Sequence, residues 1–219
     1  MNQLFSTDGV IYRFLTTTGN IIIATVLWLI GCIPVVTIGT STAALYYTIV
    51  KSVRKEVGYV HAEFWRGYKL NFKKGVAATA ALLALGVLLG LEMWLVLENG
   101  VEVNRIWYSL SGLLILLMLL VSLYLFPVMS RFDMKLGKLC MLSFVMSIRF
   151  WYITLALGAG LIAVAAAQIY LLPIPLVLLT PGLWCYASSF LVERAMKAYM
   201  PKPRQEEGSD GETPGNWYD

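Results

Sequence analysis

The sequence predicts an all-α membrane protein: a bundle of about five transmembrane helices with amphipathic helices on the cytoplasmic side, an external N-terminus and an internal C-terminus. The first observation behind this prediction is composition. Hydrophobic residues make up 58% of the 219 residues and charged residues only 14%, with a mean hydropathy of +0.71. Soluble domains are about one-quarter charged, so this chain has too few polar side chains to cover a soluble globule. The other two observations are the long apolar runs and the placement of the basic residues.

Five apolar runs are long enough to cross a membrane, at residues 19–36, 75–96, 107–128, 151–171 and 174–192. A transmembrane helix needs about 20 predominantly apolar residues. Inside lipid only a helix satisfies every backbone group within one segment, and none of the runs alternates as a barrel strand would. We therefore expect a single transmembrane domain over residues 1–200. The acidic, Gly- and Ser-containing residues 201–219 are expected to form a disordered cytoplasmic tail.

The basic residues orient the predicted bundle. Of the 17 Lys and Arg residues, fifteen fall in segments that five spans place on one side, and only Arg13 and Arg105 fall on the other. Cytoplasmic loops carry an excess of Lys and Arg. We therefore expect residues 41–74 and 134–150 to lie in the cytoplasm.

These two cytoplasmic segments are predicted to form amphipathic helices. In the first, an aromatic stripe comprises Phe64, Trp65, Tyr68 and Phe72, and a basic stripe comprises Arg66, Lys69, Lys73 and Lys74. Adjacent apolar and cationic faces are typical of a helix that lies among lipid headgroups. The same pattern arises when an apolar face packs on the protein's own spans, since periodicity does not distinguish lipid from a neighbouring helix. Both alternatives remain open, so the stripes are candidate contacts for lipid or for a protein partner.

A corner is predicted at the end of the first span. Pro34 removes a backbone donor and disfavours helix at the preceding residue, and Gly39 permits a turn. We expect the span to break here and to restart as an amphipathic helix. The corner, which includes Thr37, is either purely structural or an elbow on which a partner docks.

Catalytic chemistry is sparse in this sequence. His61 is the only histidine, and the metalloprotease, nucleophile-elbow and P-loop motifs are missing. The three cysteines are widely spaced, which disfavours a disulfide framework or a zinc cluster. We therefore expect no enzymatic activity, no cofactor, no metal site and no nucleic-acid partner.

The predicted spans carry two further kinds of candidate residue. Glu92 and Gln168 are polar groups at membrane depth, where they either reach water and neighbouring helices or form a binding site. Gly86 and Gly90 form a GxxxG motif, and Ala156 and Gly160 have the same small-residue spacing. Small residues allow helix backbones to approach closely. Packing within the chain is the interpretation we favour for these residues.

Three segments together resemble the YesL-like family of bacterial integral membrane proteins, whose biochemical activity is not assigned. They are CIPVVTIG at 32–39, AALYY at 43–47 and FWRGYKLNFKK at 64–74. The resemblance implies a multi-pass protein of the cytoplasmic membrane of Gram-positive bacteria. It also implies genes located beside those for carbohydrate uptake transporters and polysaccharide-degrading enzymes.

From this resemblance and the sparse chemistry we expect an auxiliary or regulatory subunit that associates with the permease of a carbohydrate ABC transporter. One alternative is a small autonomous carrier or channel with a site near Glu92 and Gln168. Another is a scaffold that binds membrane lipids through the basic stripe, or an intramembrane enzyme.

Overall fold

The structure, a computed structural model, describes residues 10–98, 105–170 and 174–199. These ranges hold helices and turns and no strand, so the all-α prediction is confirmed for them. The helices in chain order are α1 (Val10–Gly31), the 3₁₀-helix η1 (Val35–Thr37), α2 (Ile38–Thr48), the π-helix η2 (Ile49–Arg54), α3 (Val60–Glu98), α4 (Arg105–Arg131), α5 (Leu136–Arg149), α6 (Trp151–Tyr170) and α7 (Ile174–Met196). The predicted tail lies outside the described residues.

Three of the described helices are long and apolar enough to cross a membrane: Tyr12–Gly31, Val60–Leu95 and Ser109–Arg131. A fourth candidate combines Leu136–Arg149 with Trp151–Ala166, two helices that meet at a bend of 95°. The fifth predicted run lies in α7, whose first residues have side chains outside the described part of the chain. Three to four candidate spans indicate a membrane protein, and the count of five stays a prediction.

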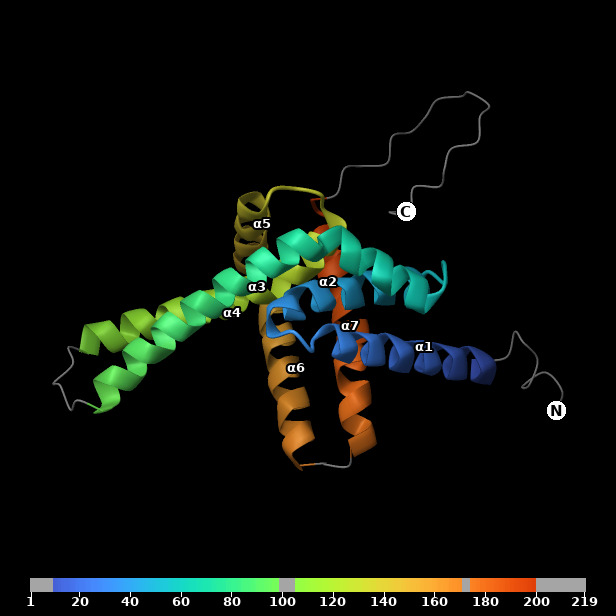
Figure 1. The fold of residues 1–219 in the computed structure, drawn as a ribbon, viewed down its shortest axis with the longest axis horizontal. Helices are drawn as coiled ribbons and strands as arrows, with labels where there is room; N and C mark the ends of the chain where they lie inside the picture. Colours follow the sequence, from blue (N-terminus) through green and yellow to red (C-terminus); the bar gives the residue numbers. More distant parts are fainter. Residues whose placement is uncertain (1–9, 99–104, 171–173, 200–219) are drawn as a thin grey trace, which may run out of the picture.

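The best-packed part of the molecule is a junction that we call the hub. It comprises α2, η2, the first half of α3, α5, and the last turns of α4 and α7. Figure 1 shows α2 at the centre of this region, with α3, α4 and α7 around it. Its fully buried side chains come from all of these elements: Tyr46, Ile49, Phe64, Val128, Leu139 and Met196. The hub therefore joins the helix ends that the sequence predicts to be cytoplasmic.

The helical segment predicted over residues 41–74 is interrupted. After α2 and η2 the chain turns at residues 55–59 and restarts as α3, with positive φ angles at Glu56 (57°) and Gly58 (79°). Only glycine adopts such angles without a steric penalty. From Val60 onward the helix runs without a break into the predicted second span, so the basic stripe and that span belong to one helix, α3.

The start of α1 contacts a segment that the sequence analysis assigned to the other side of the membrane. Arg13, near its start, forms an ion pair with Glu56 at 2.9 Å, and a Cβ added at Gly31, its last residue, would lie 3.4 Å from the Tyr68 ring. Helix α1 therefore lies beside residues 56–68. The sequence analysis assigned Arg13 to the outside and Glu56 to the cytoplasm. These two assignments cannot both hold, because a hydrocarbon core of about 30 Å does not separate atoms in contact.

Two helical hairpins, α3–α4 and α6–α7, extend from the hub in different directions (Figure 1). With 39 residues at about 1.5 Å each, α3 is about 58 Å long, nearly twice the thickness of the hydrocarbon core. Its basic residues all lie in the first half. The second half is therefore the part suited to the membrane. We call residues 86–98 of α3 and 105–119 of α4 the distal hairpin.

Candidate functional site

The predicted corner is packed into the protein. Pro34 precedes η1, and the buried Thr37 hydroxyl donates to the carbonyls of Gly31 (2.8 Å) and Pro34 (2.7 Å). The backbone N–H of Gly39 donates to Oγ1 of Thr79 at 3.0 Å. A Cβ at Gly39 would lie 2.2 Å from that same oxygen, so only glycine fits there. Thr37 and Gly39 thus shape the corner, and any partner would meet its exposed apolar residues Ile33, Val35 and Val36 instead.

The aromatic stripe is divided between the interior and the surface. Phe64 is fully buried and Tyr68 is half-buried, whereas Trp65 and Phe72 are exposed. The four rings contact one another in sequence, with centroid distances of 5.5–6.2 Å. Phe64 therefore stabilises the hub, and Trp65 and Phe72 remain available to lipid or a partner.

The basic stripe stays at the surface of α3. Arg66, Lys69 and Lys73 are exposed, and Lys74 forms an ion pair with Asp133, just after α4. The Lys74 ammonium lowers the pKa of the Asp133 carboxyl, through their hydrogen bond first and through charge second. These cations lie next to Trp65 and Phe72, so the arrangement is the one expected of an interfacial helix.

One buried ion pair connects η2 to the start of α3. The Lys51 ammonium lies 2.9 Å from a carboxylate oxygen of Glu63, and the two side chains are only 8% and 12% exposed. The same ammonium donates to the Tyr47 hydroxyl at 3.3 Å. Lys51 belongs to the π-helix η2, a rare conformation that occurs frequently at functional sites.

A second buried ion pair joins the ends of α4 and α7. Nε of Arg131 donates to Oε1 of Glu193 at 2.8 Å, and Arg131 is 2% exposed at its side chain. The Tyr46 hydroxyl donates to the same oxygen at 3.4 Å. Burial, and then the Glu193 charge, raise the pKa of Tyr46 well above its usual value. Tyr46 therefore remains a neutral hydrogen-bond donor at physiological pH.

Arg54 connects η2 to α7, next to the Arg131–Glu193 ion pair. Its Nη1 donates to both the carbonyl and the hydroxyl of Ser189 at 3.2 Å, and its guanidinium carbon lies 4.0 Å from the Phe190 ring centroid. A guanidinium over an aromatic face is a favourable cation–π contact. Three cations of the basic segments, at positions 51, 54 and 131, are therefore structural parts of the hub.

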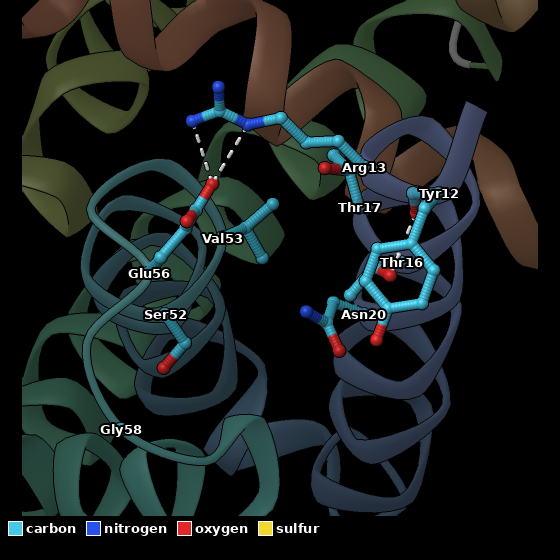
Figure 2. A pocket seen from close by; sticks show the side chains of 9 residues that line it. All are labelled: Tyr12, Arg13, Thr16, Thr17, Asn20, Ser52, Val53, Glu56 and Gly58. Atoms are coloured by element: carbon cyan, nitrogen blue, oxygen red, sulfur yellow. Dashed lines mark hydrogen bonds and ion pairs between the residues drawn. The ribbon is translucent and has the colours of Figure 1, made fainter. Parts of the chain in front are cut away.

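A polar pocket of about 510 Å³ lies between α1 and the turn after η2 (Figure 2). Its lining comprises Tyr12, Arg13, Thr16, Thr17 and Asn20 from α1, and Ser52, Val53, Glu56 and Gly58 from the facing segment. Both Nε and Nη2 of Arg13 donate to one oxygen of Glu56, at 3.1 and 2.9 Å. Hydroxyl, amide and charged groups therefore line one pocket, where they can form hydrogen bonds to a small polar molecule.

The small residues of the spans fall into two environments. A Cβ at Gly160 would lie 2.4 Å from the Trp184 ring of α7. The Trp184 ring therefore packs directly against the backbone at Gly160. A Cβ at Gly86 would meet only the Met118 methyl at 3.5 Å, and one at Gly90 would meet nothing within 4 Å. Ala156 is exposed. Gly90 therefore takes no part in close packing within the described residues.

Glu92 and Gln168 lie on different hairpins. Glu92 accepts a hydrogen bond from the Ser111 hydroxyl at 3.3 Å, which joins α3 to α4. Gln168 belongs to the last turn of α6, and its side chain lies outside the described part of the chain. The far ends of α3 and α6 are well separated in Figure 1. The structure thus does not bring these two residues into one site.

Sequence reasoning missed the polar pocket and the buried ion pairs. The pocket has a signal in the sequence, because Arg13, Thr16, Thr17 and Asn20 recur at helical spacing and form a polar face on α1. The Arg131–Glu193 pair has a weaker signal, a carboxylate that directly follows the last apolar run. Neither signal identifies the residue at the other end of the ion pair, which lies 43 residues along the chain from Arg13 and 62 from Arg131.

A comparison with known proteins identifies one region. Residues 21–93 match the family model described as "Protein of unknown function, DUF624". This DUF624 region covers about a third of the chain and contains the corner, α2, η2, the two stripes and the first part of the distal hairpin. No curated protein and no solved structure matches the chain. Within the described residues, no group of three or more His, Cys, Asp or Glu side chains could hold a metal ion.

Proposed function

We propose that this chain is a non-enzymatic, multi-pass subunit of a complex in the bacterial cytoplasmic membrane, which binds another membrane protein through its distal hairpin. The observation that carries the proposal is the open space at Gly90. A GxxxG face lets a second helix approach closely, and at Gly90 this one is not filled by the described residues of its own chain.

The side chains around Gly90 support this assignment. Val87, Leu91 and Trp94, within about one turn of Gly90, are all exposed, whereas Leu89 faces the chain's own interior and is buried. The hairpin is held together on that inner side, where the Ser111 hydroxyl donates to Glu92. Its outer side is therefore a continuous apolar surface that can contact lipid or a partner helix. At Gly90 this surface has no side chain, so a partner helix can approach closely there.

The partner we propose is the permease of a carbohydrate ABC transporter. The support is the resemblance to the YesL-like family, whose motif segments all lie within the DUF624 region. The chain would act as an auxiliary or regulatory subunit, with the hub as a rigid platform at the membrane surface.

Purification from native membranes under gentle solubilisation tests this proposal. We expect permease subunits to co-purify with the wild-type chain and to be lost from Gly90→Leu, whose added side chain would block close approach and whose Cβ meets no described atom of its own chain within 4 Å. Ala81→Leu is the matched control, because Ala81 is exposed on the same helix but about 180° from Gly90 around its axis. Recovery of the wild-type chain without permease subunits would contradict the proposal.

A second candidate function, lipid binding at the membrane surface, is favoured by the exposure of Trp65 and Phe72 beside Arg66, Lys69 and Lys73. Attraction between exposed charges is screened by salt. Binding of the purified chain to anionic lipid should therefore fall steeply as salt is added. Salt-independent binding would exclude a basic surface as its cause.

A further inference from the structure

A second pocket, of about 260 Å³, lies between the first half of α3 and the end of α4. Its polar lining includes Arg66, Asn71, Lys74, Ser130, Arg131 and Asp133. A space of this volume is large enough for a phosphate group with its first ester substituent.

The pocket has an excess of positive charge. Three cationic side chains and one carboxylate line it. Arg131 is paired with Glu193 and Lys74 with Asp133, whereas Arg66 has no ion-pair partner among the described residues. The Asp133 side chain is 97% exposed, so it can move away from Lys74 without disturbing the packing. An incoming anion would then meet the free charges of Arg66 and Lys74.

The two cations reach the pocket from one helix. Arg66 and Lys74 are eight residues apart on α3, with Leu70 midway, so all three side chains line one face of the helix. Lys69 and Lys73 do not line the pocket. A defined pocket and a general basic stripe thus share one helix and can be separated by mutation.

The pocket also has an apolar border. Leu70, Met129 and Phe132 belong to its lining, and Leu70 is 65% exposed. The candidate span Ser109–Arg131 ends at the pocket, so a membrane crossed by this span would have its headgroup region there. Basic pockets between helices at this boundary are a known form of lipid headgroup site.

We propose that this pocket binds the phosphate of an anionic phospholipid, with Arg66 and Lys74 as the phosphate ligands and Leu70 and Phe132 against the glycerol and the first acyl carbons. Asp133 holds Lys74 when the pocket is empty. The site does not depend on the distal hairpin or on any protein partner, so it can fail while the proposed function stands, and the reverse.

The test is titration of the purified full chain, in neutral detergent, with dioctanoyl phosphatidic acid, followed by the ³¹P linewidth. We expect saturable binding of this lipid and weaker binding of dioctanoyl phosphatidylcholine, whose headgroup carries no net charge. Inorganic phosphate serves as a third ligand. If it binds as tightly as the lipid, the phosphate site stands but its natural ligand is soluble, which overturns the lipid assignment.

Matched variants locate the site. Arg66→Gln and Lys74→Gln should each weaken binding about ten-fold or more, since each variant loses a charge-assisted hydrogen bond to the phosphate. Lys69→Gln and Lys73→Gln remove the same charge from the same helix and should leave affinity within about two-fold. Equal losses in both pairs would show a diffuse basic surface and would overturn the proposal.

Asp133→Asn separates ligand binding from a structural role of the Lys74–Asp133 pair. It should bind the lipid at least as tightly as the wild type, because the competing anion is gone. If Asp133→Asn weakens binding as much as Lys74→Gln does, the ion pair merely supports the local structure, and Lys74 is not a phosphate ligand.

Discussion

Helix α3 belongs to both regions of the molecule, and its glycines show how the two regions differ. In the hub, a Cβ at Gly75 would lie 2.3 Å from Oγ1 and 2.7 Å from Cα of Thr40, and one at Gly67 would lie 3.0 Å from the Tyr47 ring. In the distal hairpin, a Cβ at Gly90 would meet no described atom within 4 Å. One residue type on one helix thus permits close packing inside the chain at one end and leaves a surface open at the other.

The ion pairs show the same contrast. Arg131 and Glu193 are almost fully buried in the hub, whereas Arg13 and Glu56, at its edge, are 76% and 60% exposed at their side chains. A buried pair whose partner is removed leaves a charge without solvent, whereas an exposed charge regains water. The hub should therefore be sensitive to changes that its edge and the distal hairpin tolerate.

The largest expected effect is an all-or-none difference in membrane sidedness. In a chain whose three cysteines are replaced by serine, single cysteines at Tyr12 and Tyr59 should both react with an impermeant thiol reagent applied to the cytoplasmic side. A cysteine at Glu98, at the far end of the distal hairpin, should react only from outside. The first two residues flank the Arg13–Glu56 contact, so both lie on the side of the hub. Labelling of Tyr12 and Tyr59 from opposite sides would show that the contact does not form in the membrane.

The next effect is on stability. Glu193→Gln should lower the free energy of unfolding by about 3–5 kcal/mol, because it leaves the buried Arg131 guanidinium without its counter-charge. Glu56→Gln makes the same chemical change at an exposed pair and should cost at most about 1 kcal/mol. Denaturant unfolding of the purified chain in detergent measures both. Similar losses in the two variants would mean that the hub pair is not buried.

A smaller effect is expected from glycine substitution on α3. Gly75→Ala should destabilise the protein by about 1–3 kcal/mol, since the new methyl group meets backbone as well as side-chain atoms of Thr40. Gly90→Ala meets nothing and should be neutral or stabilising by up to about 1 kcal/mol, because alanine favours helix. Thermal unfolding of the two variants side by side checks the difference. A stable Gly75→Ala protein would contradict the close contact of α3 with α2.

Local features of the fold could be predicted from the sequence, and long-range contacts could not. Apolar run length is enough to place helices at 75–96 and 107–128, which lie within α3 and α4. It does not show that α1 lies beside residues 56–68, because an apolar helix that packs on α2 and one that crosses lipid have the same hydropathy. The polar face of α1 is the sequence feature that indicates a contact with a polar segment of the chain.

The candidate site shows the same limit at single residues. Phe64 and Trp65 are adjacent aromatics, yet Phe64 is buried and Trp65 is exposed. Lys51 and Lys69 are both lysines of one predicted basic segment, yet only Lys51 is buried against a carboxylate. Composition and spacing assign such residues to a helix. Which of them face the interior depends on partners elsewhere in the chain, here Glu63 across the turn and the ends of α4 and α7.

The most direct test of the proposed function is a photo-crosslinking residue at Trp94, one turn from Gly90 on the exposed side of α3, activated in native membranes. We predict a crosslink to a carbohydrate ABC transporter permease, lost in Gly90→Leu, and no such product from the same residue at Leu155, which is equally exposed on α6. Crosslinks from Trp94 to lipid alone, or identical products from both positions, would contradict partner binding by the distal hairpin.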